Sequence, residues 1–310
     1  MSTILITGGT GLVGRQLTEL LIEKGHNIIV VTRDSSRHQE RPQLEFAEWD
    51  VKKQAIDAAA IQRADHIIHL AGAPVFDKRW TPAYKRELEE SRIKSSELLV
   101  RSLQTQQHTV KTVVSASAIG WYGADDTPGY PFIETDKADD SFLGRLCQSW
   151  EESIQPAQTA NTRLVIIRIG IVLSNRGGFL APIQQGLRFG VATITGDGKQ
   201  VVSWIHIQDL CRIFLQAIED DSMTGPYNAV APAPASMKEI VLKEGRLVKG
   251  SFFIPMHVPA FLLKPVLGER SIEVLKSTTV SCNKIKDTGF TFLYPSINAA
   301  LQALKKDTAL

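Results

Sequence analysis

The sequence predicts an α/β protein whose centre is a doubly wound parallel sheet, and two observations lead to this fold class. Short runs rich in β-branched residues alternate with helical segments through about residue 170, as in a parallel sheet with helices on both faces. The first run, residues 4–6, ends in glycines that lead directly into a helix, which is the context of a dinucleotide-binding turn. We therefore expect a Rossmann-like sheet followed by a smaller C-terminal α+β portion.

The first motif is a set of glycines at a three-residue spacing. Gly8, Gly11 and Gly14 precede residues 15–24, a helical segment that Gly25 ends. Glycines let the backbone approach a pyrophosphate, and the helix N-terminus offers N–H groups and a favourable dipole. A tight turn with a purely structural purpose is the alternative. The residues expected to contact a cofactor here are Gly8, Thr10, Gly11, Leu12, Val13 and Gly14.

The second strand, residues 27–33, ends where a Rossmann fold selects its cofactor. Arg33 follows Gly14 by 19 positions, close to the expected interval of roughly 20 residues. A guanidinium matches the 2′-phosphate of NADP, so we expect Thr32 and Arg33 to contact NADP. The alternative is that Asp34 binds the ribose 2′-OH of NAD.

The third strand is expected at residues 44–48, with Asp50 shortly after its end. Two roles for Asp50 remain open. It can accept a hydrogen bond from the adenine amino group of the cofactor, or it can cap a helix over residues 52–60.

The fourth strand lies within residues 65–72 and ends in small residues that let the backbone approach the cofactor. We expect Leu70, Ala71 and Gly72 to contact it. His69 lies inside this apolar strand, so a histidine of the core or near the cofactor is favoured over a catalytic base.

A long helix follows, with Thr81 as its cap and Pro82 at its first position, and its apolar residues recur to about Leu103. Because this helix runs beside the nucleotide, Arg92 is a further expected cofactor contact. The later elements are expected as strands at 111–116, 163–169 and 225–230, a strand-to-helix passage at 201–218, and helices at 143–154, 180–189, from Met237, at about 267–275 and from near Ser296.

The alternation of strands and helices weakens after residue 173, which predicts two domains. Residues 1–230 form the NADP-binding Rossmann domain, with a substrate-side insertion at about 174–200. The alternating alanines and prolines at 231–235 mark a boundary. Residues 231–310 then form the smaller, substrate-side portion.

Composition excludes several classes of function. The net charge of +2 argues against general nucleic-acid binding. Cys147, Cys211 and Cys282 are odd in number and lack a CxxC spacing, which indicates a reducing compartment and no metal site. The most apolar stretch, residues 251–267, is interrupted by three prolines, so no membrane helix is expected. We expect a cytoplasmic protein that acts on a small molecule.

Several segments together resemble the extended short-chain dehydrogenase/reductase superfamily, which includes nucleotide-sugar epimerases. The segments are residues 7–14, 69–72, 115–123 and 204–210. More narrowly, the chain looks like the epimerase-like family of uncharacterised oxidoreductases that is sometimes labelled cell-division-inhibitor-like. The segments that carry this narrower resemblance are residues 79–81, 91–92, 150–151, 268–269 and 287–290. The resemblance covers essentially the whole chain, and it implies a homodimer through the long helix that begins at Pro82 and the helix from Phe142.

The chain departs from the superfamily at its catalytic pair. The resemblance implies a Tyr-x-x-x-Lys pair, in which lysine and the nicotinamide lower the tyrosine pKa so that the phenol exchanges a proton. Aligning Glu151 with a glutamate that often follows the lysine places Leu143 at the tyrosine position and Cys147 at the lysine position. No Tyr-x-x-x-Lys occurs anywhere in the chain. The standard mechanism is therefore absent.

Two hydroxyl groups are the candidates for a catalytic role. Ser117 keeps the position of the superfamily's substrate-binding hydroxyl. Tyr122 lies five residues later, in a loop with glycines at the carboxyl edge of the sheet, where such folds bind ligands. A structural or substrate-contact role for Tyr122 is favoured over proton transfer.

Four other residues have both a structural and a functional interpretation. Cys147 is a reactive thiol or, as favoured, a small core residue. His206 and Asp209 are an acid–base pair or, as favoured, part of a helix start. Arg168 ends a buried strand, where a ligand phosphate or an internal carboxylate would both neutralise it.

The leading hypothesis is an NADP-dependent, epimerase-like oxidoreductase with a non-standard proton donor or none. The second is a nicotinamide-binding sensor or scaffold without turnover, because binding residues are present where the proton-transfer residues are not. A conventional nucleotide-sugar epimerase is disfavoured by Leu143 and Cys147.

Overall fold

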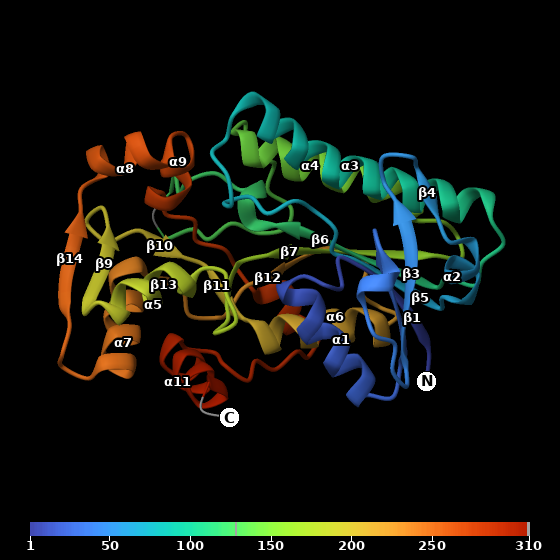
Figure 1. Ribbon diagram of the computed structural model, residues 1–310. Coiled ribbons are helices and arrows are strands. Elements are labelled where there is room, and N and C mark those ends of the chain that lie inside the picture. The colour runs from blue at the N-terminus through green and yellow to red at the C-terminus, as the bar shows by residue number, and fades with distance from the viewer. Residues whose placement is uncertain (128, 309–310) are drawn as a thin grey trace.

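The computed structural model describes residues 1–127 and 129–308. Within these residues, an eight-stranded sheet runs through the molecule in the order β12-β7-β6-β5-β1-β2-β3-β4 (Figure 1). Its strands are β1 (Thr3–Thr7), β2 (Asn27–Thr32), β3 (Leu44–Asp50), β4 (Ala55–Ile56), β5 (His66–His69), β6 (Thr112–Ala118), β7 (Arg163–Ile169) and β12 (Gly225–Ala229). Neighbouring strands are parallel except for β4, which is antiparallel to β3.

The direction in which strands are added reverses between β1 and β5. The chain builds outward from β1 through β2 and β3, then returns to the other side of β1 and continues from β5 to β12. Thr7 and His69, which end β1 and β5, are partners in register. Ligands of doubly wound sheets bind at such a switch point, because the turns that follow the two strands diverge to opposite faces. The glycine motif therefore lies at this position.

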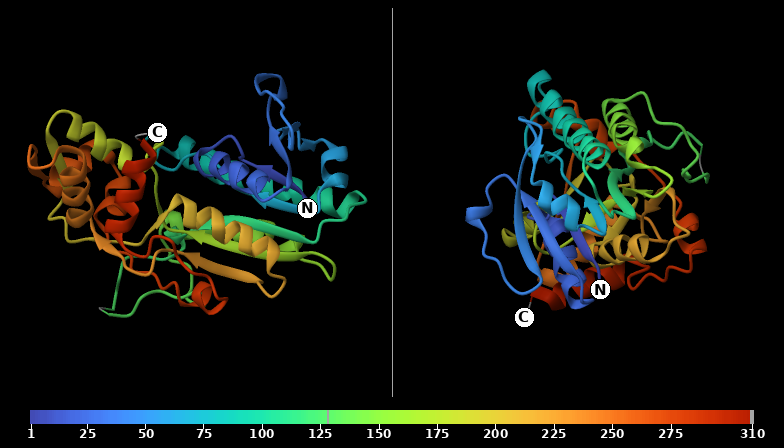
Figure 2. Two further views of the ribbon diagram at one scale, coloured as in Figure 1. Left: turned by 90° about the horizontal axis from the view of Figure 1, so that it is seen from below. Right: turned by 90° about the vertical axis from the view of Figure 1, so that its right-hand side faces the viewer.

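Helices cover both faces of the sheet, as the end-on view of Figure 2 shows. The helices of one face are α1 (Leu12–Glu23) and α6 (Ile207–Glu219), and those of the other are α2 (Ala58–Arg63), α3 (Pro82–Thr105) and α4 (Phe142–Ile154). Side chains alternate between the faces along each strand: Ile4 and Ile6 contribute to the first hydrophobic cluster, and Leu5 contributes to the second. This architecture confirms the predicted doubly wound, Rossmann-like sheet.

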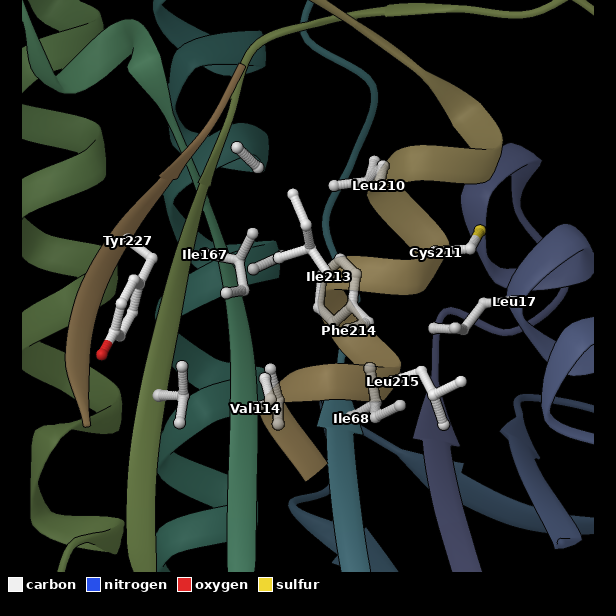
Figure 3. Close-up of a cluster of buried hydrophobic side chains, with 14 of the residues drawn as sticks. Leu17, Ile68, Val114, Ile167, Leu210, Cys211, Ile213, Phe214, Leu215 and Tyr227 are labelled. Carbon is white, nitrogen blue, oxygen red and sulfur yellow. The ribbon is translucent and has the colours of Figure 1, made fainter. Parts of the chain in front are cut away.

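Helix α6 supplies much of the apolar surface on the first face. Figure 3 shows Leu210, Ile213 and Phe214 of α6 lying over Val114 and Ile167 of the sheet. Phe214 and Ile213 are completely buried. Burial of each such side chain stabilises the fold by about 1.5–3 kcal/mol.

A second lobe lies at the carboxyl edge of the sheet (Figure 1). Its strands pair as β8 (Ile171–Leu173) with β11 (Trp204–His206), β9 (Val191–Thr195) with β14 (Ile254–Val258), and β10 (Val201–Val202) with β13 (Ala235–Ser236). The helices after residue 173, apart from α6, are α5 (Leu180–Arg188), α7 (Met237–Lys249), α8 (Ala260–Leu267), α9 (Arg270–Leu275), α10 (Asn283–Asp287) and α11 (Ile297–Thr308). One hydrophobic cluster joins residues between 173 and 204 to residues between 231 and 304. The predicted insertion and the C-terminal portion thus share a core, while the division into two domains after residue 230 stays a prediction.

Two predicted helices differ from the structure, and one predicted passage lies outside the main sheet. The helix expected at 52–60 does not form: turns and β4 occupy most of this segment, and α2 begins at Ala58. The strand-to-helix passage expected at 201–218 forms as β10, β11 and α6, and its strands pair with β13 and β8 outside the main sheet. The helix expected at about 267–275 begins only at Arg270, because Gly268, with a φ of 60°, ends the preceding helix α8. In the part of the chain that the structure describes, no helix has both the length and the apolar character needed to cross a bilayer.

Candidate functional site

The turn after β1 requires glycine at its first position. Gly8 has a φ of 70°, a conformation that side-chain-bearing residues rarely adopt. A Cβ atom at Gly8 would lie 2.9 Å from the carbonyl carbon of Leu70 and 3.0 Å from the nitrogen of Ala71. The turns after β1 and β5 therefore meet through bare backbone, and both expose that backbone at the switch point.

The start of α1 packs directly on this turn. A Cβ atom at Gly14 would lie 2.4 Å from the Gly8 oxygen. The N-cap is Gly11, which offers no side-chain hydrogen bond, and the first turn of α1 holds no acidic residue. The N–H groups of Leu12 and Val13 thus keep no side-chain partner, and they suit an anion such as a diphosphate. The residues present fit a dinucleotide.

Thr10 and the insertion complete the surroundings of this turn. The Thr10 carbonyl accepts a hydrogen bond of 2.8 Å from Nε of Arg15, which fixes the loop to α1. Gly178, from the predicted insertion, lies against Leu12, because a Cβ atom there would be 3.3 Å from Leu12 Cδ2. The second lobe therefore reaches the glycine motif.

A buried polar network joins β1, β5 and α3 beneath the two turns. Thr7 Oγ1 lies 2.7 Å from His69 Nδ1 and accepts hydrogen bonds of 3.2 Å from the nitrogens of Leu70 and Ala71. His69 Nε2 lies 3.2 Å from Ser96 Oγ. Since the Thr7 oxygen accepts two N–H groups, its proton goes to Nδ1 and His69 carries its own proton on Nε2.

His69 is a structural residue in this network. It is completely buried, and burial lowers its pKa to about 3. The imidazole is therefore neutral near pH 7 and does not cycle between protonation states. This supports the interpretation of His69 as a core histidine instead of a catalytic base. Sequence reasoning missed Thr7, although it immediately precedes the glycine motif.

Arg33 is open to a ligand, whereas Asp34 is engaged. The Arg33 side chain is exposed, and the described residues give it no hydrogen bond or ion pair. Asp34 accepts a 2.6 Å hydrogen bond from Ser36 and pairs with Arg37 at 2.7 Å. The hydrogen bond from Ser36 and the Arg37 guanidinium hold the pKa of Asp34 below its ordinary value. The two side chains thus differ, because Asp34 has partners within its own turn and Arg33 has none among the described residues.

Thr32 and Asp50 end their strands at the same edge. Thr32 is half-buried, with Oγ1 3.5 Å from His38 Nε2. Asp50 Oδ1 accepts hydrogen bonds of 2.9 and 3.0 Å from the nitrogens of Lys52 and Lys53. This turn competes with helix formation, so the expectation that Asp50 caps a helix over 52–60 was wrong; Asp57 caps α2 instead. A contact between Asp50 and adenine stays a prediction.

Arg92 lies beneath the turn that follows β5. It is 7% exposed and donates hydrogen bonds of 3.0 Å to the Leu88 carbonyl and 3.1 Å to the Ala73 carbonyl. A Cβ atom at Gly72 would be 3.1 Å from the guanidinium carbon. The same carbon lies 4.9 Å from the centre of the Trp150 ring. Gly72 thus admits the guanidinium next to the expected path of the cofactor.

Apolar contacts occupy the positions assigned to the catalytic pair. Leu143 and Cys147 lie on α4 against Gly120, where a Cβ atom would be 3.3 Å from Leu143 Cβ and 3.6 Å from Cys147 Sγ. Burial raises the pKa of Cys147 to about 12, so its thiol stays neutral. Cys147 behaves as a small core residue, the interpretation favoured from the sequence.

Ser117 joins a buried ion pair. Arg168 donates from Nε and Nη2 to the two oxygens of Glu151, each at 2.9 Å, and Ser117 Oγ donates to Glu151 Oε1 at 2.6 Å. The guanidinium carbon also lies 3.7 Å from the centre of the Trp121 ring. The partner of Arg168 is therefore an internal carboxylate, one of the two alternatives left open by the sequence.

Tyr122 belongs to the same network. Its side chain is completely buried, its hydroxyl donates to Asn228 Oδ1 at 2.8 Å, and it accepts a hydrogen bond of 3.0 Å from Arg168. Burial raises its pKa to about 12. The hydroxyl groups of Ser117 and Tyr122 both have protein partners, which favours a structural role for them. Asn228 was missed because its partner lies 106 positions away.

His206 and Asp209 stabilise the start of α6. His206 Nδ1 accepts a hydrogen bond of 3.1 Å from the nitrogen of Gln208. The Asp209 oxygens each accept a hydrogen bond of 2.9 Å, from the nitrogens of Leu293 and Tyr294. Both side chains are completely buried. They act as a cap and as an anchor for the C-terminal segment, as favoured from the sequence.

Models of known protein families match most of this chain. The model described as "NAD dependent epimerase/dehydratase family" matches residues 4–229. The chain belongs to this family. A second model, "Domain of unknown function (DUF1731)", matches residues 258–304. Similar members include epimerase family proteins of Mycobacterium leprae, 31% identical over 97% of this chain and 94% of the relative, and of Staphylococcus aureus, 33% identical over 99% and 100%.

Solved structures extend the likeness to three dimensions. A human epimerase family protein, determined with NADPH, has a TM-score of 0.86 at 27% identity, over 98% of this chain and 99% of the other. A nucleoside-diphosphate sugar epimerase from Corynebacterium glutamicum has a TM-score of 0.76 at 31% identity, covering 98% of this chain and 58% of that one. The chain is thus an atypical extended short-chain dehydrogenase/reductase, which confirms the resemblance inferred from its motifs.

Proposed function

We propose that the protein is an NADP(H)-binding, epimerase-like oxidoreductase that acts on a small molecule without the Tyr-x-x-x-Lys pair. The proposal rests on the contrast between two side chains at the end of β2. Arg33 is exposed and has no partner among the described residues, whereas Asp34 accepts a hydrogen bond from Ser36 and forms an ion pair with Arg37. A guanidinium binds phosphate in a bidentate manner. The human relative determined with NADPH supports the same cofactor.

The chain's own groups would hold the cofactor along the carboxyl edge of β1, β2 and β5. The N–H groups at the start of α1 suit its diphosphate, and Arg33 suits its 2′-phosphate. When bound, the nicotinamide supplies or accepts a hydride. The proposed contacts are Gly8, Thr10, Gly11, Leu12, Val13, Gly14, Thr32, Arg33, Asp50, Leu70, Ala71, Gly72 and Arg92.

Proton transfer has to proceed without a side chain at the usual position. Leu143 can neither give nor take a proton, and Cys147 stays protonated because burial raises its pKa to about 12. Ser117 and Tyr122 are committed to Glu151 and its network. We therefore infer that a substrate proton is exchanged with water or within the substrate.

Turnover is tested by incubating the protein with NADPH and a panel of ketones and enones, and with NADP+ and a panel of nucleotide sugars, because epimerisation begins by oxidising the sugar. Absorbance of the reduced nicotinamide reports oxidation, and product analysis reports epimerisation, which leaves that absorbance unchanged overall. We expect at least one compound class to react, and we expect Arg33→Leu to raise the KM for NADPH. Failure of every class, with NADPH bound, contradicts turnover.

A second candidate function is a nicotinamide-dependent sensor or scaffold. The burial of both candidate hydroxyls and the apolar contacts of Leu143 favour it, because they leave a binding surface without an evident acid. It requires a protein partner whose capture by the immobilised chain changes when NADPH is added. Capture indifferent to the nucleotide contradicts this alternative. A nucleotide-sugar epimerase of the standard type is disfavoured by the same residues.

The resemblance also leads us to propose a homodimer through α3 and α4. The outward side of α3 is charged, with Lys94 paired to Glu90 at 3.1 Å. Such an interface would be held by polar contacts, which are sensitive to salt. Light scattering at low and high salt measures the mass, and a monomer under both conditions contradicts the proposal.

We further propose a cytoplasmic location. Cys147, Cys211 and Cys282 are buried and free, as in proteins of a reducing compartment. Cell fractionation with a tagged chain checks this, and recovery from an oxidising compartment contradicts it.

A further inference from the structure

Arg92 is a buried cation that lacks an acidic partner. Its side chain is 7% exposed, and among residues 1–127 and 129–308 the structure gives its guanidinium no ion pair. The two hydrogen bonds that it donates go to the backbone carbonyls of Leu88 and Ala73. A guanidinium carries more N–H donors than these two carbonyls use.

Burying such a charge is costly unless an anion or several acceptors surround it. The ring of Trp150 faces Arg92, and the next residue along the chain is the acid Glu151. Both oxygens of Glu151, however, accept hydrogen bonds from Arg168. Trp150 Nε1 is itself buried without a partner among the described residues. The described surroundings of Arg92 therefore supply two carbonyl acceptors and a ring face, but no anion.

The position of Arg92 indicates where the missing acceptors come from. Its guanidinium carbon would be 3.1 Å from a Cβ atom at Gly72, in the turn that borders the switch point. The guanidinium also lies 4.9 Å from the ring of Trp150, which stands one turn of α4 after Cys147, the residue that the resemblance aligns with the superfamily's lysine. Arg92 thus brings a positive charge close to the place where that lysine stands in its relatives.

We propose that Arg92 replaces this lysine as the cation of the site, and that it binds oxygen atoms in the nicotinamide-bearing half of the cofactor beside Gly72. This inference rests on the proposed NADP(H) binding. Arg92 acts as a positioning residue: it holds the second ribose or its phosphate, and it transfers no proton. The absence of a tyrosine at position 143 is consistent, because no phenol remains whose pKa a lysine would lower.

Two ligands separate this role from general binding. NADPH contains both halves of the cofactor, whereas adenosine 2′,5′-bisphosphate contains the adenine, one ribose and its two phosphates only. By calorimetry, Arg92→Met should weaken NADPH binding about ten- to one-hundredfold, the effect of losing charge-assisted hydrogen bonds. Its affinity for the bisphosphate should equal that of the wild type. Arg92→Lys should recover part of the NADPH affinity.

Arg33→Leu is the matched control, because it should weaken both ligands. The thermal midpoint of Arg92→Met without ligand should be unchanged or raised, since removing an unpaired buried charge relieves its desolvation. Equal NADPH affinity in Arg92→Met and wild type, or equal loss of both ligands, overturns the inference. Should Arg92→Met not fold, wild-type NADPH affinity in Arg92→Gln or no partial recovery in Arg92→Lys overturns it. Failure of the wild type to bind either ligand instead contradicts the proposed function.

Discussion

Glu151 and Arg168 form a two-point ion pair inside the protein, with both nitrogen–oxygen distances at 2.9 Å. Their side chains are 9% and 3% exposed. The pair joins α4 to β7, and α4 also carries Leu143 and Cys147, which the resemblance aligns with the superfamily's tyrosine and lysine. The same network includes the hydroxyl groups of Ser117 and Tyr122.

Glu151→Gln should destabilise the protein by about 3–5 kcal/mol, because it leaves the Arg168 charge buried without a counterion. Urea unfolding measures the free energy of unfolding. Glu152→Gln, an exposed change on the same helix, is the control and should alter this free energy by less than about 0.5 kcal/mol. Equal effects of the two variants contradict the structural role of the pair.

Gly8→Ala should abolish NADPH binding as well as destabilise the fold. Gly8 and Gly25 both have positive φ values, 70° and 84°, so alanine at either costs about 1–2 kcal/mol in the backbone. A Cβ atom at Gly8 would lie 2.9 Å from the Leu70 carbonyl carbon, whereas one at Gly25 would have nothing within 4 Å. Calorimetry should therefore find NADPH binding lost in Gly8→Ala and retained in Gly25→Ala. Retention in both variants contradicts the assignment of the turn.

Cys147→Lys should not restore the superfamily's pair. It would place a second cation near Arg92, in a site where burial already disfavours charge. We expect a loss of about 3 kcal/mol or more in the free energy of unfolding. Cys147→Ala, the control, should cost about 1 kcal/mol through the lost volume. A stable Cys147→Lys variant contradicts the described surroundings of Arg92.

Acid should weaken the fold through its buried histidines. Burial lowers the pKa of His69 to about 3, and those of His66 and His206 to about 4. A histidine whose folded pKa lies below its unfolded value of about 6.5 binds more protons when unfolded, so stability is full above that value and falls as the pH decreases.

Urea unfolding between pH 7.5 and 4.5 should show this loss, with a slope of up to about 1.4 kcal/mol per pH unit for each histidine. His69→Gln should remove one histidine's share of the slope. A free energy of unfolding that is constant across this range contradicts the neutral, buried state of these side chains.

Arg33→Leu should weaken NADPH binding about ten- to one-hundredfold and leave NADH binding unchanged, because only NADPH carries the 2′-phosphate. Calorimetry with both nucleotides provides the measurement. Arg15→Leu removes another cation at this edge, one that donates a hydrogen bond to the Thr10 carbonyl. It tests whether the loss of any positive charge here weakens NADPH binding as much as the loss of Arg33 does. Equal loss for NADPH and NADH in Arg33→Leu contradicts recognition of the phosphate.

The parts of the fold that depend on local pattern could be predicted from the sequence. Strand β7 was expected at residues 163–169 and α7 from Met237, and both begin there. The helix expected at 52–60 failed because the Asp50 side chain stabilises a local turn. Periodicity does not report such side-chain hydrogen bonds.

The glycine turn between β1 and α1 was predictable because its glycines are contiguous with a strand and a helix. The surroundings of the catalytic candidates were not, because they depend on contacts between distant segments. Tyr122 bonds Arg168 across 46 positions and Asn228 across 106. No pattern within either segment indicates that the hydroxyl is buried instead of facing a substrate.

The most direct test of the central claim is calorimetric titration of the wild-type protein with NADPH and, separately, with NADH. The open Arg33 guanidinium predicts that NADPH binds at least about tenfold more tightly, the effect of one charge-assisted phosphate contact. Absence of NADPH binding, or affinity for NADH equal to or greater than that for NADPH, would contradict the account.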